Sequence, residues 1–173
     1  MFRIFSNKSR HDDDSRRDRD SRDTSSGSTG RTISYDPSLI TDLKRDHHDL
    51  VDAFQRIWSE GYEKRDFRHL SQLLTAFKSS FQAHLIKENV RFYVYLEQAL
   101  AGDIHTLQIV KDFRTDMNDI ANAVVQFCKR YNHEAFSQEM IRDFKLDYDK
   151  IGEALVRRVT LEEKELYTLY QPS

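Results

Sequence analysis

The fold is set by residues 77–95, which read FKSSFQAHLIKENVRFYVY. Six positions in this stretch follow one another at intervals of three or four, the spacing of one helix face: Phe77, Phe81, His84, Glu88, Phe92 and Tyr95. His84 and Glu88 lie one turn apart between aromatic residues, so such a helix would bury both of them. Taking an ionised group out of water costs on the order of several kcal/mol even after relaxation. The sequence therefore predicts that a metal ion, or a basic side chain on a facing helix, compensates for this cost.

Three more segments show the same apolar periodicity, which predicts four amphipathic helices in all. They are expected at residues 37–61, 66–100, 103–127 and 136–166. Asp36 followed by Pro37 is expected to cap the first helix, and Asp103 the third. Gly152 is expected to mark a close approach of two helices rather than a break. Because the connections are short and no segment alternates as a strand would, we predict an all-α, up-down-up-down four-helix bundle over residues 34–173.

Residues 1–33 are expected to be a disordered charged tail. They are rich in serine and charge and contain almost no apolar residue after Phe5, so they cannot bury enough surface to offset the entropy of ordering. Eight Lys or Arg against six Asp give this tail a net charge of +2. Since the whole chain carries −2, residues 34–173 carry about −4, which argues against nucleic-acid binding.

Several classes of protein are not expected from this sequence. No apolar run is long enough to span a membrane or to form a signal peptide. Cys128 is the only cysteine, so an intrachain disulfide is not possible, and we expect a cytoplasmic protein. No glycine-rich phosphate loop and no glycine-flanked nucleophilic serine is present. We therefore expect that the chain is not an enzyme.

Polar residues at inward-facing helical positions form the candidate site. The set comprises His47 on the first predicted helix, His84 and Glu88 on the second, and Arg158, Glu162 and Glu163 on the fourth. Bundle cores commonly hold metal ions between imidazole and carboxylate groups of facing helices. Two histidines with one or two carboxylates suit zinc, iron or manganese, and the pattern does not distinguish among these metals.

This pattern resembles the hemerythrin-like (HHE cation-binding) family over about residues 36–170. The residues that carry the resemblance are Asp46, His47 and Leu50, then His84 and Glu88, and finally Glu162, Glu163, Leu166 and Tyr167. The resemblance implies a four-helix bundle holding two irons that are bridged by two carboxylates and otherwise bound by histidines. It also implies oxygen binding, oxygen or redox sensing, or metal storage in a bacterial-type protein.

The family pattern is incomplete in this chain. Met117 stands where the third helix of the family supplies histidines, and Arg158 stands where the fourth supplies its histidine. The resemblance leaves as metal ligands His47, His84, Glu88 and Glu163, with Glu162 in reserve. Because the losses fall on one of the two irons, we expect a reduced site, mononuclear or vestigial, in a sensor or regulator.

Two physical interpretations of the reduced site are open. In the first, a single divalent ion, iron or another, lies among the two histidines, Glu88 and one of the two glutamates at the end of the fourth helix. In the second there is no metal, and the Arg158 guanidinium takes its place by donating hydrogen bonds to both Glu88 and Glu163. The two can also coexist, with Arg158 neutralising one side of a single-ion site.

A second resemblance, to the Rsd/AlgQ family, suggests an alternative function. It is carried by residues 77–102, by residues 151–155, and by Val159, Leu161, Glu162 and Glu163. Proteins of that family are four-helix bundles without a metal centre that bind the housekeeping sigma factor of bacterial RNA polymerase. The alternative expectation is therefore a metal-free regulator whose partner is the sigma factor.

Overall fold

The structure, a computed structural model, describes residues 32–172. The predicted disordered tail of residues 1–33 lies outside this range except for Thr32 and Ile33. The described chain is mostly helical and contains no strand. Its elements are α1 (Leu39–Arg56), η1 (Ile57–Tyr62), α2 (Phe67–Lys87), η2 (Glu88–Tyr93), α3 (Val94–Ala99), α4 (Ile104–Tyr131), α5 (Gln138–Lys164) and η3 (Leu166–Leu169).

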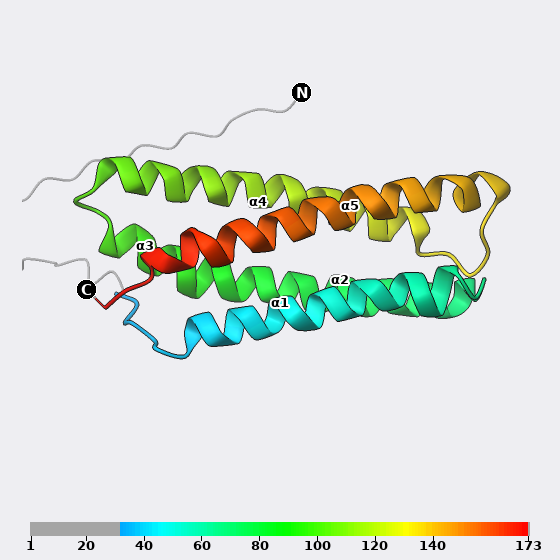
Figure 1. Ribbon diagram of the computed structural model, residues 1–173, viewed down its shortest axis with the longest axis horizontal. Helices are drawn as coiled ribbons and strands as arrows, with labels where there is room; N and C mark the ends of the chain where they lie inside the picture. The colour runs from blue at the N-terminus through cyan, green and yellow to red at the C-terminus, as the bar shows by residue number, and fades with distance from the viewer. Residues whose placement is uncertain (1–31, 173) are drawn as a thin grey trace, which may run out of the picture. The chain divides into compact units, whose positions relative to one another are not determined.

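Residues 32–172 form an antiparallel helical bundle (Figure 1). α1 packs against α2 and α5, and α4 packs against α2 and α5. The turns η1 and η2 are π-helical, and η2 joins α2 to α3 so that the three form the second long helix expected from the sequence. The predicted all-α bundle with up-down-up-down order is confirmed. None of the described helices is long and apolar enough to cross a membrane.

Side-chain caps fix where three of the long helices begin. A side-chain oxygen accepts a hydrogen bond from the backbone N–H three residues further on at Asp66, Asp103 and Ser137. Such a bond satisfies one of the free N–H groups of a first helical turn, and the cap predicted at Asp103 is confirmed. α1 begins at Leu39, later than expected, because Oδ1 of Asp36 accepts bonds from the backbone and the hydroxyl of Ser38 and holds a turn there.

The buried polar residues form a layer between two apolar clusters. One cluster includes Phe77 and Phe144, and the other includes Leu43, Phe92 and Leu166. In sequence, the buried polar residues lie between the positions that belong to the first cluster and those that belong to the second, on α1, on the second long helix and on α5 with η3. They are His47, His84, Glu88, Arg158 and Glu162. The bundle therefore supports this layer with close-packed apolar side chains at both ends.

Gly152 lies where two helices approach closely. It is inside the unbroken helix α5, and a Cβ atom at this position would lie 3.2 Å from Cε1 of Phe54 on α1. The close approach predicted from the sequence is confirmed.

Gly61 allows an even closer approach, and we expect Gly61→Ala to destabilise the fold. A Cβ atom at this position would lie 2.7 Å from Cβ and 2.9 Å from Cα of Leu70 on α2. Since the backbone of a packed helix cannot yield cheaply, we expect the free energy of unfolding to fall by about 1–3 kcal/mol. Chemical denaturation measures this loss. Gly102→Ala is the matched control because a Cβ there would meet nothing within 4 Å, and an equal loss in both variants would contradict the interpretation.

Candidate metal centre

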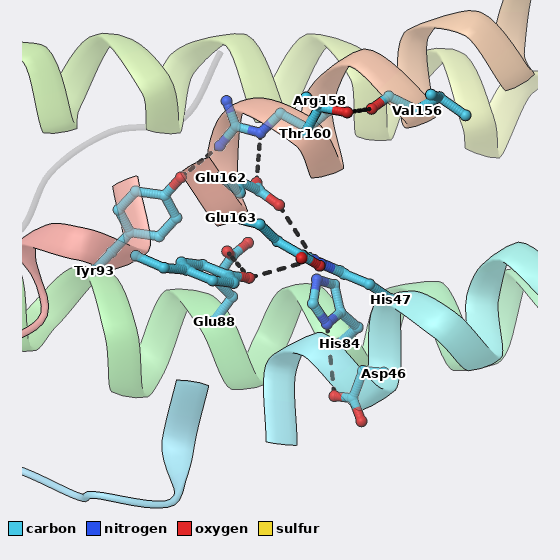
Figure 2. Close-up of polar contacts among 11 residues, drawn as sticks. Asp46, His47, His84, Glu88, Tyr93, Val156, Arg158, Thr160, Glu162 and Glu163 are labelled. Atoms are coloured by element: carbon cyan, nitrogen blue, oxygen red, sulfur yellow. Dashed lines mark hydrogen bonds and ion pairs between the residues drawn. The ribbon is translucent and has the colours of Figure 1, made fainter. Parts of the chain in front are cut away.

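The buried polar side chains come from three long helices and lie close together (Figure 2). Among the described residues, the buried polar or charged ones are His47 on α1, His84 and Glu88 on the second long helix, and Arg158 and Glu162 on α5. None of the five is more than 5 % exposed. The sixth candidate, Glu163, lies at the edge of the layer, where its side chain is 31 % exposed.

The imidazole of His47 contacts both glutamates at the end of α5. Its Nδ1 is 2.9 Å from Oε1 of Glu163, and its Nε2 is 3.2 Å from Oε2 of Glu162. A carboxylate on the outer nitrogen fixes the orientation of a histidine ring and raises its basicity, and metal-bound histidines commonly have such a partner. Because Glu162 is buried and Glu163 is partly exposed, Nε2 is the nitrogen on the interior side of the ring.

His84 has an outer carboxylate of the same kind. Its Nδ1 lies 3.5 Å from Oδ2 of Asp46, and Lys87 holds that carboxylate through an ion pair of 2.6 Å. Nδ1 of His84 has no hydrogen-bond partner among residues 32–172. The ring lies beside that of His47, with the two ring centroids 4.8 Å apart. Both histidines are thus oriented by acidic groups on their Nδ1 sides.

Three of these side chains could hold one metal ion. His47, His84 and Glu162 each offer a ligand atom, and these atoms lie within 4.8 Å of one another. Figure 2 shows the three side chains approaching one another from α1, α2 and α5. Two imidazoles and a carboxylate suit a divalent ion such as iron, zinc or manganese. Within the part of the chain that the structure describes, no second group of this kind is present, so the residues fit a single ion and not a pair.

The two other predicted ligands lie next to this group but outside it. Glu163 contacts the Nδ1 of His47 rather than its inner nitrogen. Glu88 is buried, and its Oε1 accepts a hydrogen bond of 3.2 Å from the hydroxyl of Tyr167. Its Oε2 has no hydrogen-bond partner among the described residues. The geometry therefore favours Glu162, the reserve ligand of the sequence analysis, over Glu163.

Arg158 places a permanent positive charge against the same carboxylate. Its Nε donates to Oε1 of Glu162 at 2.5 Å, and its Nη2 donates to the hydroxyl of Tyr93 at 2.6 Å. The guanidinium carbon also lies 5.2 Å from the ring centre of Phe113. The structure differs here from the expected hydrogen bonds to Glu88 and Glu163. Arg158 and Glu162 are four residues apart on one helix, which brings their side chains together without a tertiary contact.

Sequence reasoning missed two tyrosines that complete the network. Tyr167 donates to Glu88, and its oxygen lies 3.2 Å from Nε2 of His47. Tyr167 follows the end of α5 in the 3-10 turn η3, where the spacing of an α-helix face gives no signal of its direction. Tyr93 follows Glu88 by five residues. In an α-helix these two would point in different directions, and it is the π-helical turn η2 that buries both.

Burial and neighbouring charges shift the pKa values of this network in opposite directions. Burial raises the pKa of Glu88 to about 8, and the nearby charge of Glu162 adds to the increase. Burial would also raise the pKa of Glu162, but the hydrogen bond with His47 and the charge of Arg158 outweigh it and leave that pKa below its usual value. Burial lowers the pKa of His84, and the charge of His47 lowers it further.

Burial would lower the pKa of His47, but its hydrogen bonds with Glu162 and Glu163 outweigh burial and leave that pKa above its usual value. In the metal-free protein the cationic forms of His47 and Arg158 therefore face the ionised Glu162. Glu88 is protonated at pH 7.

Glu88→Gln is expected to flatten the pH dependence of stability in the metal-free protein. Since Glu88 has a pKa of about 8 in the folded state and an ordinary value of 4.5, the folded state binds more protons than the unfolded state between these values. The free energy of unfolding therefore falls as the pH rises from about 4.5 to about 8. Urea unfolding with a chelator present, repeated across this range, measures the slope. Exposed Glu153→Gln should leave the slope unchanged, and a Glu88→Gln variant with the wild-type slope would contradict the assignment.

The comparison with known families agrees with the geometry. Residues 38–170 match the family described as the hemerythrin HHE cation binding domain. This match confirms the resemblance inferred from His47, His84, Glu88 and the glutamates of α5. No curated protein and no solved structure shows a significant match to the chain. The resemblance to the Rsd/AlgQ family stays a prediction.

Proposed function

We propose, on the premise that the chain belongs to the hemerythrin HHE cation-binding domain family, that it binds a single divalent metal ion and acts as a sensor or regulator. The observation that carries this proposal is the buried group of His47, His84 and Glu162, whose ligand atoms lie within 4.8 Å of one another. Iron is the first candidate, and zinc and manganese suit the same donors.

In this proposal the inner nitrogens of His47 and His84 and a carboxylate oxygen of Glu162 hold the ion. Asp46 and Glu163 orient the two imidazoles from their Nδ1 sides. An ion held by three protein groups has open coordination positions, where it would supply Lewis-acid or redox chemistry. Glu88, whose buried Oε2 has no hydrogen-bond partner among the described residues, is an additional buried carboxylate beside this group.

The proposed regulatory role follows from the charge that an ion would add to the bundle. In the metal-free network Arg158 and His47 both pair with Glu162. Glu162 would have to share its carboxylate between Arg158 and a bound divalent ion, and the added positive charge would favour the ionised form of Glu88. Binding would therefore redistribute hydrogen bonds across α1, η2 and α5, which is a way to couple an ion or its redox state to a partner-binding surface. We propose a binding protein and no catalytic step.

A thermal-shift measurement on untagged protein tests the proposal. An ion that binds only the folded state raises the melting temperature, by an amount that grows with the logarithm of its concentration relative to its dissociation constant. We expect Fe²⁺, Mn²⁺ or Zn²⁺ to raise the melting temperature of the chelator-treated protein, and Mg²⁺, which prefers oxygen ligands, to have little effect. The same melting temperature with and without each of the three transition ions would overturn the proposal.

The ion pair of Arg158 with Glu162 supports a second candidate function, a metal-free regulator that binds the sigma factor of RNA polymerase. A guanidinium at 2.5 Å from one carboxylate oxygen neutralises buried negative charge without a metal, although its partner is Glu162 and not the expected Glu88 and Glu163. Retention of purified sigma factor on the immobilised chain, in chelator, tests this candidate. If sigma factor does not bind in chelator, this candidate is eliminated.

A further inference from the structure

A cavity of about 290 Å³ lies inside the bundle between α1 and α5. Most of its wall is apolar, and its inner wall includes Leu50 and Phe54 from α1, Phe77 and Phe81 from α2, Met117 from α4 and Leu155 from α5. Phe54 is held in place by Tyr148, whose ring stacks on it with centroids 4.3 Å apart and whose hydroxyl donates to the Phe54 carbonyl at 3.2 Å. The cavity therefore has at least one wall of fixed aromatic rings.

The mouth of the cavity carries negative charge. Exposed residues around it include Gln55 on α1, and Asp149, Glu153 and Val156 on α5. Lys145 pairs with Asp149 at 2.5 Å, so one of these two acidic groups is neutralised. The negative charge at this rim disfavours the entry of an anion.

The inner end of the cavity is polar and reaches the candidate metal centre. His47, His84, Arg158 and Glu162 all line it. Arg158 and Glu162 already bond each other, and Arg158 also bonds Tyr93. His84 is different: it is 5 % exposed, its outer Nδ1 faces Asp46, and its inner Nε2 has no hydrogen bond to any residue within 32–172. The cavity thus ends on a buried imidazole whose inner nitrogen is not hydrogen-bonded by the described residues.

We propose that this cavity binds an uncharged, mostly apolar organic molecule that carries one hydroxyl group, with the apolar body between the aromatic walls and the hydroxyl at His84. Ligand pockets typically have this character, an apolar lining with a few polar groups that fix orientation.

The size of the cavity sets the size of the ligand. An apolar cavity of about 150 Å³ in another protein takes up benzene, so a cavity of about 290 Å³ has room for roughly eight to twelve non-hydrogen atoms. This is far larger than a diatomic gas. The two ends argue against an anion, because the rim is acidic and the inner guanidinium is already bound to a carboxylate. The mostly apolar wall between them argues against any ionised group, which would lose its hydration there. The proposal does not depend on metal binding.

Titration of the metal-free chain with p-cresol tests the proposal. The measurement is made with a chelator present, so that a failure of metal binding would not affect it. We expect saturable binding and a higher melting temperature, with toluene binding more weakly because it has no hydroxyl. We expect 4-methylbenzoate, which has the same shape with a negative charge, to bind at least about tenfold more weakly. Comparable affinity for p-cresol and 4-methylbenzoate would overturn the assigned ligand class.

Two tryptophan variants on α5 locate the binding site. Leu155→Trp fills the cavity and is expected to weaken p-cresol binding by at least about tenfold. Leu146→Trp is the matched control, because Leu146 is 58 % exposed on the same helix and does not line the cavity. If Leu155→Trp does not fold, nuclear Overhauser effects from the p-cresol ring to the methyl groups of Leu50 and Leu155 in the wild type give the same information. Absence of saturable binding, binding unchanged in a folded Leu155→Trp variant, or absence of those effects would overturn the proposal.

Discussion

Replacement of His84 by alanine is expected to abolish metal binding, whereas replacement of His48 by alanine should leave it intact. His84 supplies one of only three ligand atoms in the buried group, and an ion held by two protein groups has lost one of its three donor atoms and with it most of its affinity. His48 is next in sequence to His47, but its side chain is 76 % exposed, and its Nε2 lies 3.5 Å from Oδ2 of Asp52. The two variants therefore separate binding at the buried site from adventitious binding by surface histidines.

A smaller loss of metal affinity is expected when Asp46, the carboxylate behind His84, is changed instead of the ligand itself. Asp46→Asn keeps the shape of the side chain but removes the charge behind His84, and loss of such a supporting group typically costs about 10–100-fold in metal affinity. Competition with a chromogenic chelator measures all three variants on one scale. Equal affinities of wild type, His84→Ala and Asp46→Asn would contradict the assignment of His84 as a ligand.

Replacement of Arg158 by alanine is expected to cost about 3–5 kcal/mol of stability in the metal-free protein, the usual cost of breaking a buried ion pair. Arg158 is 4 % exposed and Glu162 is 1 % exposed, so the variant leaves a buried carboxylate with less compensation and the Tyr93 hydroxyl without its donor. The control is Arg157→Ala, one position away on the exposed face of α5. Urea unfolding in chelator measures both.

Two further measurements separate an effect of charge from an effect of packing. The double variant Arg158→Met, Glu162→Leu removes both charges, and we expect it to be more stable than Arg158→Ala because no uncompensated ion remains. Added metal should restore part of the stability of Arg158→Ala, since an ion can take over the neutralisation of Glu162. A loss no larger than that of Arg157→Ala would contradict a structural role for this ion pair.

The sequence predicted the bundle and the identity of the buried polar residues because the three- and four-residue spacing of a helix face can be read directly from the order of residues. His47, His84 and Glu88 replace aliphatic residues at positions of a continuous apolar stripe, and that substitution is a strong signal. The choice between Glu162 and Glu163 was not predictable in the same way. Adjacent residues of a helix differ in direction by about 100°, so a small rotation of α5 decides which carboxylate faces inward.

Other parts of the site depend on local geometry that composition does not encode. Tyr93 enters the network because the turn after Glu88 is π-helical, and a single sequence gives no reliable signal for such a turn. Tyr167 lies beyond the end of α5, where helical periodicity no longer applies. The cavity is likewise a property of how four helices pack and not of any one segment.

The number of metal ions bound per chain bears most directly on the proposed single-ion site. Untagged protein would be saturated with Fe²⁺ without oxygen, desalted, and analysed for iron and protein. We predict one iron per chain, held by His47, His84 and Glu162. No retained iron would contradict the proposed iron site, and two irons per chain would contradict the single-ion site.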